Sequence, residues 1–104
     1  MDIALVFKCL ADENRLKIIQ LLSQRKFCVR ALSRQLDISE SAVSQHIRML
    51  KTAGLLEIGD KKGYNIHYAV NKDVLMLLAE EINQLAAAVQ QNRVCGGNCK
   101  EEKK

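Results

Sequence analysis

Residues 29–56 read VRALSRQLDISESAVSQHIRMLKTAGLL, and this stretch carries the strongest fold signal in the chain. Apolar residues recur at helical spacing on both sides of a short break at residues 37–39. The positions are Val29, Leu32 and Leu36 before the break, and Val43, Ile47 and Leu50 after it. Two helices joined by so short a turn predict a helix-turn-helix.

The second helix of this pair leaves a polar face toward solvent. Its side chains are Ser41, Ser44, Gln45, His46 and Arg48. Hydroxyl, amide, imidazole and guanidinium groups suit the base edges and phosphates of the DNA major groove. We therefore expect this helix to be a recognition helix and the chain to bind double-stranded DNA.

The composition restricts the other classes of protein. A chain of 104 residues that is 48% apolar is long enough for one domain with a packed core. No apolar run approaches the ~20 residues that span a bilayer, and Asp2 stands where a secretory signal carries basic residues. We expect a cytoplasmic protein without a membrane partner. The sequence shows no nucleophile–base pair, phosphate loop or His/carboxylate metal set, so we expect no enzyme.

The net charge of +4 is unevenly distributed. Residues 1–72 contain twelve Lys or Arg against seven Asp or Glu, whereas residues 73–104 contain four against five. The basic excess therefore lies with the helix-turn-helix, which agrees with phosphate contact. Many soluble domains carry a similar excess as plain solvated surface, and that alternative stays open.

Two further helices are predicted before the helix-turn-helix. The first covers residues 2–11, where Ile3, Val6, Phe7 and Leu10 share one helix face. Asp12 is the predicted N-cap of the second, which carries Leu16, Ile19 and Leu22 to the core. Phe27 and Cys28 are predicted to form a short bridging strand. Ser39 is the predicted cap of the recognition helix, and Gly54 is predicted to end it.

After Gly54 the apolar period changes from 3.6 to 2. Ile66, Tyr68 and Val70 alternate with polar or small residues, and residues 59–63 read GDKKG, which predicts a hairpin with a five-residue loop. A basic hairpin after a recognition helix is a wing, and Lys61 and Lys62 at its tip are expected to touch DNA. The alternative is a solvated turn. Ser39, Lys51 and Tyr64 complete the expected DNA contacts.

The last helix is predicted from residue 71 or 72 to about residue 92. Leu75, Leu78, Ile82, Leu85 and Val89 follow one another at intervals of 3, 4, 3 and 4, which is an a/d seam. We expect part of this seam to pair two chains, with help from the first helix; the alternative is burial within the monomer. A dimer brings two recognition helices to an imperfectly palindromic operator. We divide the chain into a winged-helix DNA-binding and dimerisation domain, residues 1–92, and a flexible cysteine-containing tail, residues 93–104.

The chain resembles the ArsR/SmtB family of metal- and thiol-responsive repressors. The matching stretches are residues 10–18, 41–50 and 54–56 and the wing that ends at His67 and Tyr68, within a resemblance that covers about residues 3–92. It implies a mostly α-helical winged helix-turn-helix with a small β-hairpin: four helices, two strands and a fifth helix, paired through the first and last helices. It also implies repression of a resistance or homeostasis operon, and release of DNA when an inducer binds. No cofactor is expected for DNA binding itself.

The family's sensor residues match only in part. Arsenic and cadmium sensors often carry Cys-Val-Cys where this chain has Cys28, Val29 and Arg30, so that thiolate pair is incomplete. The last helix contains no histidine, so the family's zinc and nickel site is absent. Some relatives bind arsenite through cysteines near the C-terminal end of the last helix, which points to Cys95 and Cys99.

The four cysteines leave several hypotheses open. Thiolates favour soft ions, and we prefer As(III) or Sb(III) as the inducer over Cd(II), Zn(II) or another soft metal. Cys95 and Cys99 supply two ligands, and the third comes from Cys28, Cys9 or the partner chain; Cys9 is otherwise a small buried hydrophobe. A redox or reactive-sulfur switch through a Cys95–Cys99 disulfide or polysulfide competes, because it needs two thiols only. A third hypothesis is an inducer-independent architectural DNA-binding or interaction module.

Overall fold

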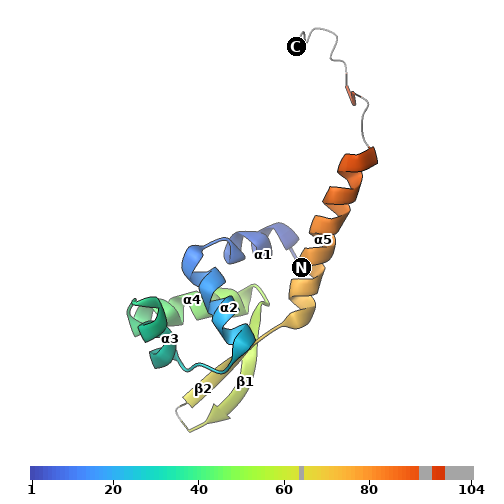
Figure 1. The fold of residues 1–104 in the computed structure, drawn as a ribbon. Helices are drawn as coiled ribbons and strands as arrows, with labels where there is room; N and C mark the ends of the chain where they lie inside the picture. Colours follow the sequence, from blue (N-terminus) through green and yellow to red (C-terminus); the bar gives the residue numbers. More distant parts are fainter. Residues whose placement is uncertain (64, 92–94, 98–104) are drawn as a thin grey trace.

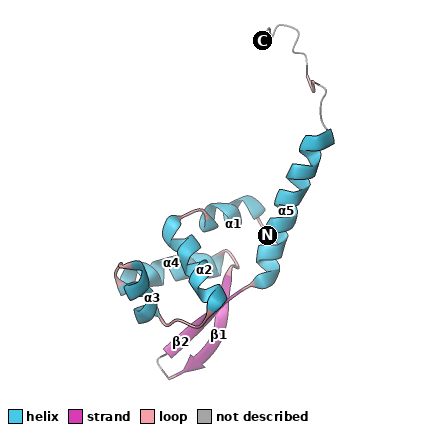
Figure 2. Cartoon of the chain, viewed as in Figure 1, coloured by secondary structure: helices cyan, strands magenta, loops and turns pink. Residues whose placement is uncertain are grey.

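The computed structural model describes residues 1–63, 65–91 and 95–97. Its elements follow the predicted order, four helices, a two-stranded antiparallel hairpin and a fifth helix (Figures 1 and 2). They are α1 (Ile3–Leu10), α2 (Glu13–Gln24), α3 (Val29–Leu36), α4 (Glu40–Thr52), β1 (Leu56–Lys62), β2 (Asn65–Val70) and α5 (Lys72–Gln91). This arrangement is a winged helix-turn-helix, as predicted.

Side-chain caps set where the helices begin. The Asp12 carboxylate accepts a hydrogen bond from the backbone N–H of Arg15 at 3.1 Å, and the Ser39 hydroxyl accepts one from Ala42 at 3.0 Å. Each cap satisfies one of the N–H groups that a helix leaves without an internal partner. The two predicted caps are confirmed, and Asp2 and Asn71 cap α1 and α5 in the same way.

The core lies between α2, α3, α4 and the start of the hairpin. Its fully buried side chains are Ile18, Leu32, Val43, Leu50 and Leu55. The prediction for α2 was wrong at Leu16, which is 40% exposed, whereas Ile18 is 0% exposed. The inward face of α2 repeats at residues 15, 18, 19 and 22, so the correct helical phase excludes position 16.

The hairpin differs from the prediction in its loop. β1 continues to Lys62, which pairs with Asn65, so residues 59–62 belong to the strand and the five-residue loop was wrong. The pairing shifts between Ile58 and Asp60, which places a bulge at Gly59. A Cβ at Gly59 would lie 3.1 Å from the Cβ of Ala69, which is a tight contact, so the bulge favours glycine.

The predicted bridging strand at Phe27 and Cys28 was also wrong. Neither of these two described residues belongs to a strand. Phe27 packs against the core instead, and Cys28 occupies the N-cap position of α3. The chain there turns into the next helix, so its backbone has no strand to pair with.

Helix α5 is covered by its own chain at one end only. Val74 and Leu78 are buried against the winged body, whereas Ile82, Leu85 and Val89 are 53%, 64% and 68% exposed. Figure 1 shows the helix leaving the body, so burial of the whole seam within the monomer is excluded. The predicted domain boundary at residues 92–93 falls outside the described residues, as does Cys99.

Candidate nucleic-acid interface

The turn between α3 and α4 is held by its own polar groups. Helix α3 ends at Leu36, and its C-cap residue Asp37 has a left-handed backbone with φ 57° and ψ 46°, a conformation that Asp tolerates better than most residues. The Ser33 hydroxyl donates a hydrogen bond to the carbonyl of Ile38 at 2.5 Å, and the Ile38 N–H donates to the carbonyl of Ser33 at 3.2 Å. These bonds fix the direction in which α4 starts.

Helix α4 turns an apolar face inward and a polar face outward. Val43, Ile47 and Leu50 are buried. The exposed face consists of Ser41, Ser44, Gln45, Arg48 and Lys51, at helical spacings of three and four residues. The structure therefore brings five of the predicted DNA-binding residues onto one surface.

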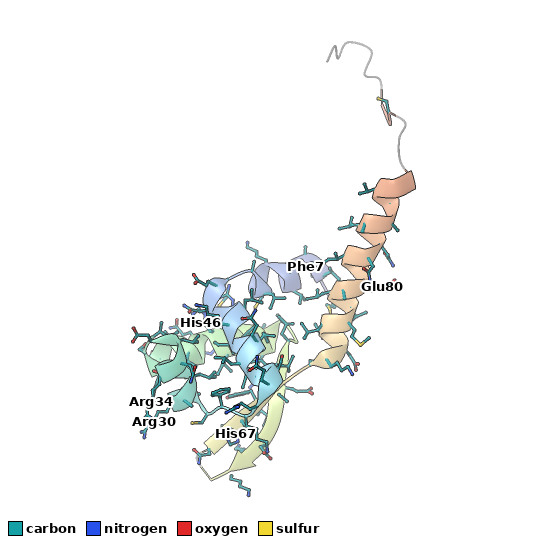
Figure 3. All side chains as sticks on the ribbon, viewed as in Figure 1. Phe7, Arg30, Arg34, His46, His67 and Glu80 are labelled. Carbon is teal, nitrogen blue, oxygen red and sulfur yellow. The ribbon has the colours of Figure 1, made fainter. Side chains whose placement is uncertain are left out.

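His46 lies away from that face. The residue is half-buried, and Arg15 of α2 donates a hydrogen bond from Nη1 to its Nδ1 at 3.4 Å (Figure 3). Successive residues of a helix are about 100° apart, so position 46 falls beside the buried positions 43 and 50. The structure places this predicted DNA-binding residue between α4 and α2.

Lys51 joins the recognition helix to the wing. Its ammonium lies 5.7 Å from the centre of the Tyr68 ring on β2. A cation–π contact at an exposed site contributes about 0.5–1 kcal/mol. This contact keeps a positive charge at the junction of α4 and the hairpin, next to the face that carries Arg48.

The wing presents two exposed lysines, Lys61 and Lys62, at the end of β1. The strand that carries them also contacts the segment just after α2, because the exposed Lys26 forms an ion pair with Asp60 at 2.5 Å. The Lys26 hydrogen bond and charge lower the pKa of the Asp60 carboxyl. Tyr64, the remaining predicted wing contact, lies outside the described residues.

Helix α3 adds basic residues that the sequence analysis missed. Arg30 and Arg34 are exposed on α3 (Figure 3), and Arg30 pairs with Glu40 of α4 at 3.6 Å. The first helix of a helix-turn-helix crosses the DNA backbone, so Arg34 is a further candidate for phosphate contact. Its position in the last turn of α3 was the available signal.

The three cysteines that the structure describes lie in separate environments. Cys9 is buried in α1, and burial raises the pKa of its thiol. Cys28 is half-buried and lines a hollow of about 630 Å³ shared with Ser44 and Tyr68, between α3, α4 and the wing. Cys95 is exposed beyond α5, and its Sγ donates to the carbonyl of Gly97 at 3.3 Å. Among the described residues, no three His, Cys, Asp or Glu side chains gather as a metal site.

A helix-turn-helix with an exposed basic recognition face and a wing defines a DNA-binding transcriptional regulator. Residues 12–57 match the family described as "Bacterial regulatory protein, arsR family". The chain is 38% identical over 80 residues to the arsenical resistance operon repressor of Escherichia coli (strain K12), covering 76% of this chain and 68% of that protein. It therefore belongs to the ArsR/SmtB family of transcriptional regulators, and it is not an enzyme.

Other relatives and solved structures agree with this assignment. The chain is 33% identical over 82 residues to a CadC homologue of Staphylococcus aureus, described as a cadmium resistance transcriptional regulatory protein (78% of this chain, 67% of that protein). An ArsR-like transcriptional regulator from Rhodococcus sp. RHA1 superposes with a TM-score of 0.73 at 28% identity, covering 86% and 83% of the two chains. Reduced HlyU from Vibrio cholerae N16961 superposes with a TM-score of 0.63 at 30% identity, covering 79% of this chain and 85% of that chain. A homodimeric winged helix-turn-helix DNA-binding domain from Mycobacterium bovis superposes with a TM-score of 0.64 at 27% identity, covering 88% of this chain and 85% of that chain. In the part of this chain that the structure describes, no helix has the length and apolarity needed to span a membrane.

Proposed function

We propose that the chain is a repressor that binds an imperfectly palindromic operator, with α4 in the major groove and the wing on the flanking DNA. The observation that carries this proposal is the exposed face of α4 with Ser44, Gln45 and Arg48, held outward by the buried Val43 and Leu50. Amide and guanidinium groups form the bidentate contacts that distinguish adenine and guanine. The relative named as an arsenical resistance operon repressor supports the role in repression.

Most of the remaining contacts follow from position on the exposed face of α4 or on the wing. Gln45 and Arg48 contact the base edges, and the hydroxyl and ammonium groups around them contact the phosphates. The full set is Ser39, Ser41, Ser44, Gln45, His46, Arg48, Lys51, Lys61, Lys62 and Tyr64. His46 contributes through its position behind the face, since its Nδ1 is turned toward Arg15.

A homodimer is the second part of the proposal. Leu5 on α1 and Ile82, Leu85 and Val89 on α5 are large apolar side chains that stay mostly exposed in the monomer. Pairing α1 and α5 with a second chain removes them from water. A similar domain from Mycobacterium bovis is described as homodimeric. We place residues 1–92 in the DNA-binding and dimerisation domain, residues 93–104 in a sensor tail, and the protein in the cytoplasm, where the operator is.

The inducer is proposed to be a thiophilic species, with As(III) or Sb(III) first and Cd(II) or Zn(II) after them. The thiol donors fit such ions in kind, and Cys95 lies exposed beyond α5 with Cys99 four residues later. In Figure 1 the segment at residues 95–97 lies at the far end of α5 from α3. A third thiolate from Cys28 of the same chain is therefore remote, which favours a site shared between two chains.

A redox or reactive-sulfur switch is the second candidate. A relative, HlyU, has a structure described as reduced, and its chain is 30% identical to this one over 79% of our sequence. Oxidation of Cys95 and Cys99 to a disulfide or polysulfide requires no third ligand and no metal. The exposure of Cys95 supports access by an oxidant.

Fluorescence anisotropy of the reduced full chain, on a labelled duplex from upstream of its own gene, tests the proposal. Arsenite, antimonite, Cd(II), Zn(II) and a polysulfide are titrated separately into the complex. Stoichiometric release by arsenite that disappears in the Cys95→Ser/Cys99→Ser double variant supports the metalloid sensor. Release by polysulfide alone, reversed by a reductant, supports the redox switch. DNA binding that ignores every reagent contradicts both and leaves an inducer-independent module.

The DNA-binding surface has its own control. Arg48→Ala is expected to weaken operator binding, because the exposed guanidinium lies in the centre of the polar face. The same duplex with both half-sites scrambled measures non-specific binding. An Arg48→Ala variant that still separates operator from scrambled DNA as the parent does means that the recognition surface has been placed wrongly.

A further inference from the structure

The guanidinium of Arg15 lies where α1, α2 and α4 meet. Its Nε donates a hydrogen bond to the carbonyl of Cys9 on α1 at 2.6 Å. Its Nη1 donates toward Nδ1 of His46 and toward Sδ of Met49 on α4, each at 3.4 Å. One side chain of α2 therefore holds the end of the first helix and the middle of the recognition helix at the same time.

The hydrogen bond to the Cys9 carbonyl caps the C-terminal end of α1. The helix ends at Leu10, and the Ala11 N–H is taken by the carbonyls of Phe7 and Lys8, so the Cys9 carbonyl needs a partner from outside the helix. A guanidinium is well suited to this place, because a positive charge at a helix C-terminus interacts favourably with the helix dipole. The Asp12 carboxylate lies beside it: the Arg15 backbone N–H and, secondarily, the Arg15 charge lower the pKa of Asp12.

Direct packing between α1 and α4 is incomplete beside this link. A solvent-open hollow of about 510 Å³ is lined by Leu5 and Cys9 of α1 and by Met49 and Thr52 of α4. Side chains that do not interdigitate across a gap transmit position poorly. The polar link through Arg15 therefore acts beside a limited apolar contact, in which Val6 and Cys9 of α1 share one buried cluster with Ile47 and Leu50 of α4.

We propose that Arg15 is a positioning residue that fixes the recognition helix relative to α1 and thereby sets the spacing of the two recognition helices in the dimer. Arg15 itself does not touch DNA in this arrangement. The inference rests on the proposed function, since it uses α1 as part of the dimer surface and α4 as the helix that reads DNA. His46 and Met49 stand directly beside Gln45 and Arg48 on α4, so a rotation of α4 moves the residues that face the bases.

The bond to His46 has a spectroscopic consequence. Nδ1 accepts from the guanidinium only when it carries no proton, so a neutral His46 is held with its proton on Nε2. Loss of the guanidinium removes this preference. Two-dimensional ¹⁵N spectra of the imidazole separate the two tautomers, which provides a readout that a general loss of stability does not produce.

Arg15→Gln in the full chain tests the proposal, with Arg25→Gln as the matched control. Arg25 lies exposed at the other end of α2, so the control removes the same charge without breaking the junction. We expect Arg15→Gln to lose operator affinity on the order of tenfold, because it removes hydrogen bonds from a charged donor. Affinity for scrambled DNA and the slope of log affinity against log salt should match those of Arg25→Gln. The His46 tautomer ratio should change in Arg15→Gln alone.

Arg15→Lys keeps the charge and lacks the planar fork, so it is expected to recover little of the affinity. It also provides the test if Arg15→Gln does not fold, as judged by urea unfolding. Parent-like discrimination of operator from scrambled DNA in a folded Arg15 variant overturns the proposal. A slope of log affinity against log salt that is lower by about one than in Arg25→Gln also overturns it, because it indicates a phosphate contact by Arg15 itself. If Arg48→Ala is also parent-like, the proposed recognition surface fails as well; if Arg48→Ala is impaired, only the role of Arg15 is refuted.

Discussion

The outer half of α5 offers the most direct test of the assembly. Leu85 is 64% exposed in the monomer and lies in the middle of the apolar seam with Ile82 and Val89. Leu85→Ala removes three carbon groups, each contributing about 0.8 kcal/mol when buried. Scaled by the exposed fraction of Leu85, the lost free energy of association is about 1.5 kcal/mol per chain and about 3 kcal/mol per symmetric dimer. The dimer Kd should therefore rise roughly a hundredfold.

Sedimentation equilibrium over a dilution series measures this dimer Kd without DNA. Met76→Ala is the matched control, because Met76 is 58% exposed on the opposite side of α5 from the seam. We expect the Kd of Met76→Ala to stay at the parent value while that of Leu85→Ala rises. Equal dimer constants for Leu85→Ala and Met76→Ala would refute the assignment of the seam to the interface, and a parent that stays monomeric at all concentrations would refute the dimer.

Three further predictions concern the wing, the stability at low pH and the core. Lys61→Ala with Lys62→Ala should reduce the slope of log affinity against log salt by about 0.9 for each phosphate that is no longer neutralised, and an unchanged slope in anisotropy titrations would mean a solvated turn. Asp60 has a lowered pKa because of Lys26, so its stabilising effect is present above the unfolded pKa of about 3.9 and is lost as pH falls through the lower folded value. The stability difference between the parent and Asp60→Asn in urea should therefore shrink below about pH 4; a constant difference would contradict the ion pair. Ile18→Ala should cost about 2–5 kcal/mol and the exposed Leu16→Ala about 1 kcal/mol or less, in urea unfolding at one protein concentration; equal costs would return Leu16 to the core.

Element type and order were predictable because they depend on local periodicity. The apolar repeat of three and four residues in α4 and the caps at Asp12 and Ser39 act within one or two helical turns, so they can be read along the chain. The hairpin loop was misjudged because the bulge at Gly59 depends on the close approach of Ala69 from the other strand. Leu16 was misjudged because two helical phases of α2 are almost equally apolar.

The candidate site divides in the same way. The exposed face with Ser44, Gln45 and Arg48 follows from the helical repeat of α4 alone. The orientation of His46 does not, because it depends on Arg15, thirty-one residues earlier in the chain. Position 15 did carry a signal, since it places a guanidinium in the inward repeat with Ile18, Ile19 and Leu22.

The amino-acid order is enough to specify the winged helix-turn-helix and the exposed polar face of α4, because periodicity, caps and turns are short-range and repeat along one element. Which distant parts meet is a property of the folded chain: Arg15 with His46, Lys51 with Tyr68, and Lys26 with Asp60. The same holds for the apolar seam of α5, which extends past the body that covers its first turns. Such contacts join residues distant along the chain, and they form only when packing of the core brings their helices together.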